Sequence, residues 1–278
     1  MFAIRRSFAR IQASLCKTYA TNSKLVEVTQ DGSTGITTIS MANPPVNILS
    51  KQLLSALNSS LMDAQRDNSR GVILTSSLPT VFSAGLDIME MYNRSEKQLT
   101  EYWQILQDTW LTLYGLEIPI AAAINGSSPA GGCVLALSCE YRVLTDGKNT
   151  IGLNETRLGL EPPTWFKFML IDTIGYRKAE LALLRGSLFP PKEALAIGLV
   201  DELAADKADA VKKCQGYING FKNVAFLGRS ATKLNLRKHN LHWLKENRQS
   251  DVANFVEFVQ LPKVQVGLKL YIESLKQK

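Results

Sequence analysis

Short apolar runs recur along the first two thirds of the chain, separated by longer segments of mixed character. Residues 71–75 (GVILT) and 120–124 (IAAAI) are nearly all apolar, which is typical of strands buried on both faces of a sheet. Residues 25–28, 36–39 and 141–144 also have strand character. The apolar pattern therefore predicts a sheet of several short strands.

Segments with helical spacing lie between these strands. Ser50 is a plausible N-cap for a helix with one leucine face: Leu53, Leu54, Leu57 and Leu61. A longer helix is expected from apolar residues spaced by four and three: Leu99, Trp103, Leu106, Trp110 and Leu113. Its aromatic stripe is more typical of core packing than of a cofactor site. The alternation of strands and helices predicts an α/β fold.

The pattern changes near residue 190. Pro191 begins a short predicted helix, and residues 199–203 form the last expected strand. Beyond residue 205 the strand patterns end, and lysine-rich helical segments follow. One segment has an apolar face that needs a partner surface: Val252, Phe255, Val256 and Val259. We therefore expect a helical appendage after about residue 205, suited to oligomerisation.

The formal net charge of +7 is concentrated at the N-terminus. No acidic residue precedes Glu27, whereas five basic residues do: Arg5, Arg6, Arg10, Lys17 and Lys24. Without those five, 27 of the 32 basic residues remain against 25 acidic ones. The body of the chain is thus nearly neutral, which argues against a nucleic-acid partner.

The first 23 residues have the composition of a mitochondrial transit peptide. They contain arginines and hydroxyl residues, no acid, and apolar residues near helical spacing: Phe2, Ile4, Phe8, Ile11 and Leu15. A disordered basic arm is the alternative. No peroxisomal tripeptide ends the chain, and no apolar run reaches the length of a transmembrane segment. We expect residues 1–23 to direct the protein to the mitochondrial matrix.

Cysteines and histidines give no sign of a metal site. Cys16, Cys133, Cys139 and Cys214 lack paired ligand spacing, and free thiols fit a reducing compartment. His239 and His242 are the only histidines, both late in the chain. We therefore expect neither a metal site nor a serine–histidine triad, and no metal or redox cofactor.

Two glycine loops follow the buried strands: Ala84-Gly85 and Gly131-Gly132. Glycine allows close approach of the backbone to a ligand, and a helix start presents unpaired N–H groups. Two converging N–H groups would form an oxyanion hole that stabilises a developing negative charge. Tight strand-to-helix turns are the more common explanation of such glycines.

Glu155 lies in an apolar stretch with Leu153, Leu158 and Leu160. Burial disfavours the charged carboxylate and raises its pKa toward a value suited to a general base. The alternative is a surface glutamate on a turn, the usual place for this residue type. The residues alone allow both interpretations.

Four segments in order resemble the crotonase superfamily of enoyl-CoA hydratases and isomerases. They are residues 43–47 (NPPVN), 81–87 (VFSAGLD), 129–133 (PAGGC) and 152–156 (GLNET). Together they are a specific signal, and the similarity runs from about residue 25 to the C-terminus. Within the superfamily the chain most resembles the mitochondrial Δ3,Δ2-enoyl-CoA isomerases.

This resemblance implies an α/β fold made of a spiral of β-β-α units, with a helical C-terminal region that forms a homotrimer. The expected parts are the transit peptide (1–23), a crotonase-like core with the acyl-CoA site (24–205), and the helical region (206–278). By the same resemblance, Glu155 is the catalytic base, and the N–H groups of Ala84 and Gly131 form the oxyanion hole. The substrate-binding residues would be Ala84, Gly85, Leu86, Asp87, Ile88, Gly131 and Asn154.

The resemblance also implies a reaction. Hydratases of the superfamily carry a second glutamate at the position of Val134, and water addition needs such a group. A single carboxylate suffices to move a double bond from 3-enoyl-CoA to 2-enoyl-CoA in fatty acid β-oxidation. We therefore expect an isomerase, with CoA entering as part of the substrate.

Two other functions remain as alternatives. A different crotonase-type acyl-CoA reaction, hydration or hydrolysis, would gain support if Glu161 were buried within reach of Glu155. A non-catalytic or RNA-binding member of the fold would show a basic surface stripe, to which residues 229–233 and 237–238 would contribute. The same basic residues would alternatively be solvated helix faces or approach the CoA phosphates.

Overall fold

The computed structural model describes residues 16–19 and 25–276. Most of the predicted transit peptide therefore lies outside the described residues, and that prediction stays untested. None of the helices in the described ranges combines the length and the apolar character that a membrane span requires.

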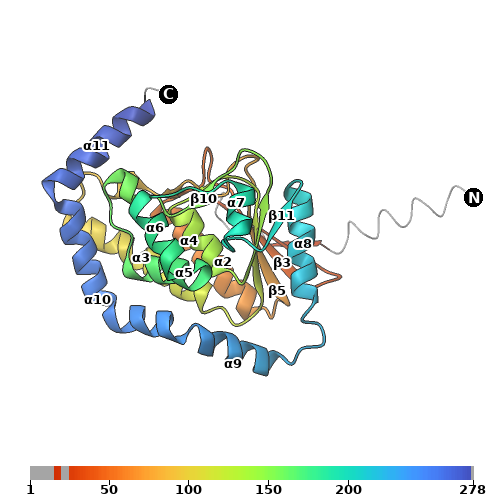
Figure 1. Cartoon of the computed structure of the whole chain (residues 1–278). Coiled ribbons are helices and arrows are strands. Elements are labelled where there is room, and N and C mark those ends of the chain that lie inside the picture. The colour runs from red at the N-terminus through yellow and green to blue at the C-terminus, as the bar shows by residue number, and fades with distance from the viewer. Residues whose placement is uncertain (1–15, 20–24, 277–278) are drawn as a thin grey trace, which may run out of the picture.

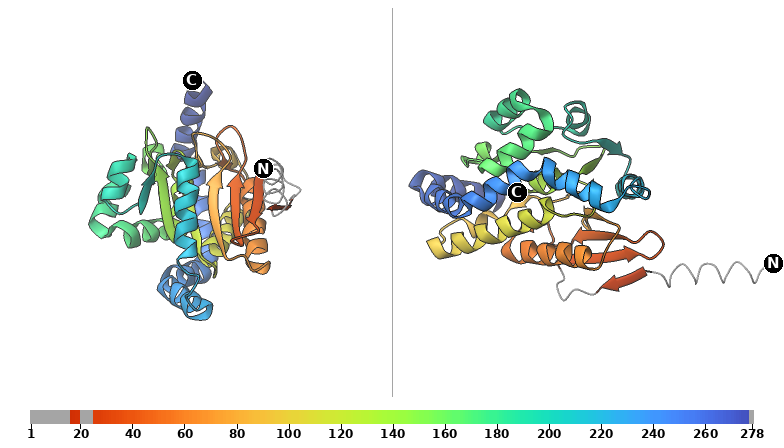
Figure 2. Two further views of the ribbon diagram at one scale, coloured as in Figure 1. Left: turned by 90° about the vertical axis from the view of Figure 1, so that its right-hand side faces the viewer. Right: turned by 90° about the horizontal axis from the view of Figure 1, so that it is seen from below.

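A seven-stranded sheet forms the centre of the molecule, in the order β1-β2-β3-β5-β7-β9-β11 (Figures 1 and 2). The first three strands pair antiparallel, and the strands from β3 onward pair parallel. The bounds are β1 Cys16–Tyr19, β2 Val26–Asp31, β3 Ile36–Met41, β5 Gly71–Ser76, β7 Ile120–Ile124, β9 Tyr141–Thr145 and β11 Glu202–Ala204.

Short strands form two further parallel pairs beside this sheet. β4 (Ile48–Leu49) pairs with β6 (Gly85–Leu86), and β8 (Ser128–Pro129) pairs with β10 (Ile151–Gly152). The chain repeats one order: a strand of the large sheet, a short strand, then a helix. The helices that close these units are α2 (Lys51–Arg66), α3 (Glu96–Tyr114), α4 (Gly131–Ser138) and α5 (Thr164–Ile174). The expected spiral of β-β-α units is confirmed.

The central strands are covered on both faces. Every residue of β5 and β7 is buried. Successive side chains point to opposite faces of a strand, so Ile73 and Ala121 pack with residues of α8 (Lys207–Asn219). Val72 and Leu74 join the larger core on the other face. Burial on both sides explains why these strands are apolar throughout.

The predicted helices begin and pack as expected. The Ser50 side chain accepts from the Leu53 N–H at the start of α2. α3 starts with a capping box in which Ser95 and Gln98 satisfy each other's backbone N–H groups. The predicted stripe of α3 is buried: Leu99, Trp103, Leu106, Trp110 and Leu113.

One predicted strand is misplaced. The last strand, β11, covers residues 202–204 rather than 199–203. Leu199 and Val200 are buried in the turn after α7 (Pro191–Ala196), where the Leu199 N–H donates to the Ala194 carbonyl. Their apolar character reflects core packing and not strand pairing. The sequence prediction also left out α5 and α6 (Tyr176–Arg185).

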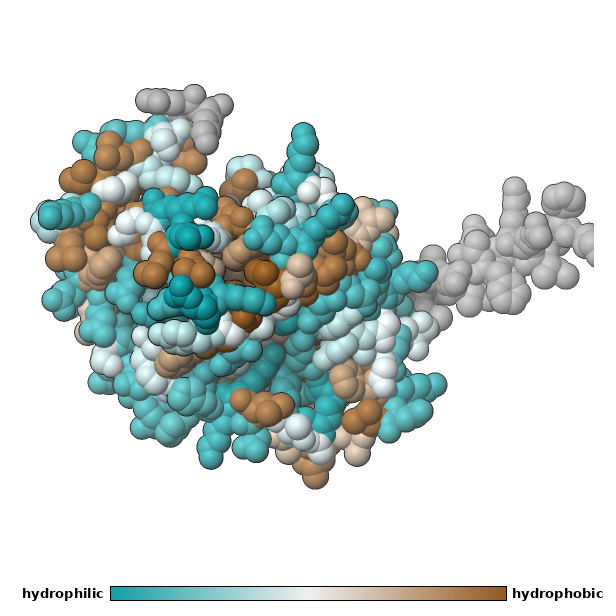
Figure 3. All heavy atoms as spheres, viewed as in Figure 1, coloured by the Kyte–Doolittle hydropathy of each residue, from teal (hydrophilic) through white to brown (hydrophobic). Residues whose placement is uncertain are grey.

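After Ala204 the described chain is helical, as predicted. α8 is followed by α9 (Phe226–Leu236), α10 (Lys238–Gln260) and α11 (Pro262–Lys276), which run around the outside of the core (Figure 1). α11 leaves several apolar side chains exposed, Val266, Leu270 and Leu275 among them. Figure 3 shows brown, apolar surface at the end of the molecule where α11 lies.

The apolar face of α10 needs no second chain. Phe255 stacks on Trp103 of α3, with ring centroids 3.7 Å apart and planes 10° apart, and Val252, Val256 and Val259 are buried. The partner surface that the sequence predicted for this face is therefore provided by α3 of the same chain.

A buried carboxylate ties α10 to the core. Asp251 Oδ2 accepts hydrogen bonds from Trp103 Nε1 at 2.7 Å, Gln107 Nε2 at 2.8 Å and Trp165 Nε1 at 3.3 Å. These donors come from α3 and α5, so one side chain joins three helices.

We expect Asp251→Ala to lower the free energy of unfolding by about 2–4 kcal/mol, because buried indole and amide donors lose their acceptor. Urea denaturation followed by tryptophan fluorescence measures this change. Asp108→Ala, which removes a partly exposed ion-pair partner of Arg248, is the control and should cost less than about 1 kcal/mol. Equal losses in the two variants would contradict the role of Asp251.

Candidate active site

The two short strand pairs bring the predicted site segments together. β6 lies within the 81–87 segment, and β8 leads to Gly131 at the start of α4. β10 pairs with β8 and is followed by Asn154 and Glu155. The Ala130 N–H donates to the Gly152 carbonyl at 2.8 Å, which joins the last two segments.

Glycines at 85 and 131 allow two loops to touch. A Cβ placed on Gly131 would lie 2.9 Å from Leu49 Cδ1 and 3.2 Å from the Leu86 nitrogen. A Cβ on Gly85 would lie 3.2 Å from the Gly131 nitrogen. Gly85 also has a φ of +93°, which side-chain-bearing residues rarely adopt. A side chain at 85 would be strained by the backbone angle, and a side chain at 131 would press on Leu49 and Leu86.

The start of α4 is held in a strained conformation. Ala130, the residue before the helix, has φ 49° and ψ −122°, a combination that favours glycine. It turns the chain so that Gly131 is the first residue of α4. The first N–H groups of a helix have no intrahelical acceptor and carry the positive end of the helix dipole, so this end favours negative charge.

The backbone N–H of Ala84 already has an acceptor. It donates to the Val46 carbonyl at 2.9 Å. This bond occupies a donor that we expected in the oxyanion hole, and it arises because the 84–86 segment pairs with the 46–49 segment. The Leu86 nitrogen of the same segment lies 3.2 Å from where a Cβ on Gly131 would be.

Glu155 is buried, not on the surface. It is 5% exposed at the start of the short 3-10 helix η2 (Glu155–Leu158). Neither carboxylate oxygen has a hydrogen-bond partner. Burial raises its pKa to about 7, and the nearby backbone N–H of Glu155 itself opposes this only in part. A carboxylate with a pKa near the working pH is a stronger base than an ordinary glutamate and is still ionised in many of the molecules, which suits a general base.

The neighbours of Glu155 are neutral. Asn154 Oδ1 is buried and also has no partner. Cys133, on the first turn of α4, interacts electrostatically with Glu155, and burial raises the pKa of its thiol so that it stays protonated. Val134 is 2% exposed. Glu155 is therefore the only carboxylate for which the structure gives this unpartnered, buried environment within the described residues.

The remaining predicted substrate residues lie where the chain leaves β6. Asp87 caps the short 3-10 helix η1 (Ile88–Glu90) and accepts from the Met89 N–H at 2.9 Å. Its pKa is raised, mainly by burial. Ile88 is partly buried against the main core.

Sequence reasoning gave no role to Asn47, which organises this region. Its Oδ1 accepts from the Asn43 N–H at 2.8 Å, and its Nδ2 donates to Ser76 Oγ at 2.7 Å and to the Phe82 carbonyl at 3.0 Å. It is wholly buried with φ 49°. The only sequence signal was its place in the 43–47 segment.

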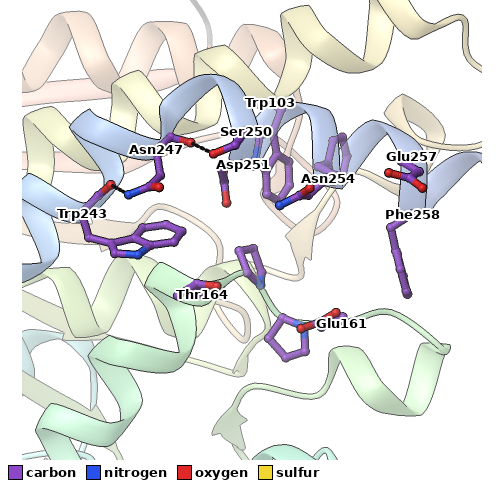
Figure 4. Close-up of a pocket in the computed structure, with 13 residues that line it drawn as sticks. Trp103, Glu161, Thr164, Trp243, Asn247, Ser250, Asp251, Asn254, Glu257 and Phe258 are labelled. Carbon is purple, nitrogen blue, oxygen red and sulfur yellow. Dashed lines mark hydrogen bonds between the residues drawn. The ribbon is translucent and has the colours of Figure 1, made fainter.

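Glu161 does not form a second buried acid beside Glu155. It is exposed and pairs with Lys167 Nζ at 2.7 Å. It borders a groove of about 430 Å³ between α10 and residues 161–164, into which Asp251 also points (Figure 4). Glu155 is not among the lining residues.

Part of the predicted basic stripe lies inside the molecule. Arg229 and Lys233 both pair with Glu140, and their side chains are 8% and 6% exposed. Neither side chain lies on a solvated face of α9, because both pair with Glu140 and so attach α9 to the core. The pKa of Lys233 is lowered to about 8, chiefly by burial.

Cys133, Cys139 and Cys214 are buried free thiols. Between residues 25 and 276 no three histidine, cysteine or acidic side chains are grouped as metal ligands would be.

The chain is similar to known proteins over nearly its whole length. It is 45% identical to the mouse protein named "Enoyl-CoA delta isomerase 1, mitochondrial", an alignment that covers 92% of this chain and 89% of that one. The human protein of that name is 43% identical, with coverage of 92% and 85%.

Solved structures of related proteins have the same fold as this chain. The crystal structure of human mitochondrial Δ3-Δ2-enoyl-CoA isomerase matches with a TM-score of 0.88 at 43% identity, and covers 91% of this chain and 98% of that one. An enoyl-CoA hydratase from Bacillus halodurans matches in fold, with a TM-score of 0.78 at 22% identity over 92% of this chain and 100% of that one. The sequence model of the family described as enoyl-CoA hydratase/isomerase matches residues 31–278. The chain therefore belongs to the enoyl-CoA hydratase/isomerase family.

Proposed function

We propose that the protein is a Δ3,Δ2-enoyl-CoA isomerase, which converts 3-enoyl-CoA to 2-enoyl-CoA in the oxidation of unsaturated fatty acids. The carrying observation is Glu155, a single buried carboxylate without a hydrogen-bond partner and with a pKa of about 7. The mouse and human relatives named as enoyl-CoA delta isomerases support the same activity.

The proposed reaction needs one base and one anion site. Ionised Glu155 removes a proton from C2 of the 3-enoyl thioester, and the electrons move into a dienolate. The N–H of Gly131 at the start of α4 stabilises the negative thioester oxygen. Protonated Glu155 then returns the proton to C4, the double bond moves to C2–C3, and the carboxylate is regenerated.

The second oxyanion donor comes from the 84–86 segment in this proposal. Ala84 would have to exchange the Val46 carbonyl for the substrate. Leu86, whose nitrogen lies 3.2 Å from where a Cβ on Gly131 would be, is the other candidate in this segment. Ala84 to Ile88 remain the proposed lining of the acyl-CoA site. Asn154 contacts the substrate, and its buried Oδ1 accepts a hydrogen bond there.

Hydration is disfavoured by the groups around the base. Val134 is an apolar side chain at 2% exposure, so it neither holds nor deprotonates a water molecule. Hydration would have gained support from a Glu161 side chain buried near Glu155. Glu161 is instead exposed and paired with Lys167. Moving a proton and a double bond consumes no electrons, and the proposal includes no cofactor.

We expect Glu155→Gln to lower the rate of isomerisation by about 10²–10⁴-fold, because the amide does not accept the C2 proton. A purified chain without residues 1–23 is given a 3-enoyl-CoA, and 2-enoyl-CoA formation and water addition are followed separately. Glu161→Gln is the matched control and should keep the parental rate. Full activity in Glu155→Gln would place the base elsewhere, and an inactive parent would overturn the isomerase assignment.

The pH dependence reports on the same carboxylate. Because only ionised Glu155 accepts a proton, kcat/KM should be constant above its pKa of about 7 and fall about tenfold for each pH unit below it. The measurement is kcat/KM for the parent from pH 5.5 to 9. A kcat/KM that stays constant down to pH 5.5 would contradict this, because it would mean that Glu155 keeps a pKa near 4.5, the ordinary value for glutamate.

We further propose that residues 1–23 direct the chain to the mitochondrial matrix and that the mature chain forms a homotrimer. The relatives carry "mitochondrial" in their names, and large apolar side chains are exposed on α9 and α11, including Leu227 and Leu236 at 80%. Native mass spectrometry of protein recovered from the matrix should give three chains, each shortened to near residue 24. A full-length single chain would contradict both parts.

A further inference from the structure

One buried hydroxyl connects both strands of the β4–β6 pair. Tyr102 lies on α3 and is wholly buried. Its phenolic O–H donates to the Leu49 carbonyl at 2.9 Å and accepts from the Asp87 N–H at 3.0 Å. Leu49 is the last residue of β4, and Asp87 directly follows β6. The hydroxyl therefore joins the ends of two segments that belong to different β-β-α units.

Packing alone does not require this hydroxyl, because phenylalanine would fill the same space for the ring. A polar atom buried without partners costs about 1–3 kcal/mol, and here both the donor and an acceptor position are used. Burial raises the pKa of Tyr102 well above its usual value. The hydroxyl therefore stays protonated at any working pH, so it can donate to the Leu49 carbonyl and accept from the Asp87 N–H throughout.

Leu86, which precedes the Asp87 N–H that Tyr102 binds, lies close to the proposed oxyanion site. Leu86 pairs with Leu49, and its nitrogen lies toward Gly131, 3.2 Å from where a Cβ on that glycine would be. Tyr102 holds the peptide group that follows Leu86, through the Asp87 N–H. If this peptide rotated, Leu86 would shift against the start of α4. Donors aimed at a developing charge work best when their position is fixed before the reaction.

We propose that Tyr102 is a positioning residue for the reaction: its hydroxyl fixes the Leu86–Asp87 peptide against the N-terminus of α4 and so preorganises the oxyanion hole. This inference rests on the proposed isomerase function. Tyr102 acts through Leu86 and Asp87, and it is not itself a group that we place on the substrate.

The test uses Tyr102→Phe in the chain without residues 1–23, beside Tyr114→Phe. Tyr114 lies on the same helix and is 7% exposed; its ring stacks on Trp110 and its hydroxyl accepts from Asn240 Nδ2 at 3.2 Å. It is a matched control, because it loses a buried hydroxyl far along α3 from Asp87. We expect Tyr102→Phe to lower kcat for isomerisation by about 10- to 100-fold with KM changed less than about threefold. Tyr114→Phe should keep kcat within about twofold.

A spectroscopic readout separates positioning from general damage to the fold. A 3-oxoacyl-CoA has an acidic C2 proton, and its enolate, which absorbs in the near ultraviolet, carries the same oxyanion as the proposed intermediate. The parent should enrich the bound enolate. Tyr102→Phe should reduce the absorbance at saturation without a large change in the concentration needed to saturate.

The outcomes are distinguishable. Parental kcat and parental enolate absorbance in Tyr102→Phe would overturn the inference and leave the isomerase function intact. Equal losses of kcat in Tyr102→Phe and Tyr114→Phe would also overturn it, since they would indicate a purely structural effect. A parent that forms the enolate but does not isomerise would overturn the proposed function, and the absorbance would then still decide the role of Tyr102. A parent that does neither overturns both.

Discussion

The site depends on two short parallel strand pairs, β4–β6 and β8–β10, which stand beside the large sheet. Each pair joins consecutive turns of the β-β-α spiral, so residues from different units come within contact distance. The large sheet supplies rigid strands covered on both faces, and the short pairs set where its loops meet. Without them, the glycine at 131, the 84–86 segment and Glu155 would belong to separate loops with no fixed relation.

This arrangement places a carboxylate where the fold does not stabilise its charge. A pKa of about 7 against the ordinary 4.5 corresponds to about 3 kcal/mol of unfavourable free energy for the ionised folded form. The cost is absent below pH 4.5, where the glutamate is protonated in both the folded and the unfolded chain, and is complete above pH 7. Interactions elsewhere in the folded chain offset this cost. α10 contributes through Asp251 and the Phe255–Trp103 stack, and α9 contributes through Arg229 and Lys233 on Glu140.

The candidate site thus combines a buried base, Glu155, with backbone N–H groups of Gly131 and the 84–86 segment, whose positions are fixed by their surroundings. Asn47 and Tyr102 use buried side-chain hydrogen bonds to fix the segments around β4 and β6. Ala130 holds a strained backbone angle at the start of α4. Polar side chains and backbone strain of this kind lower stability unless the surrounding packing fixes them, and the continuous core around α3 and α4 provides that packing.

The sequence by itself determined what depends on local pattern. Apolar runs identified β5 and β7, spacing identified the buried face of α3, and four ordered motifs identified the family. It did not determine whether Glu155 was buried, because burial depends on residues distant in the chain. The tertiary structure decided that Ala84 donates to Val46, that Leu199 and Val200 pack in a turn, and that α3 covers the apolar face of α10. In each case the residue type was compatible with two environments, and contacts from other elements selected one.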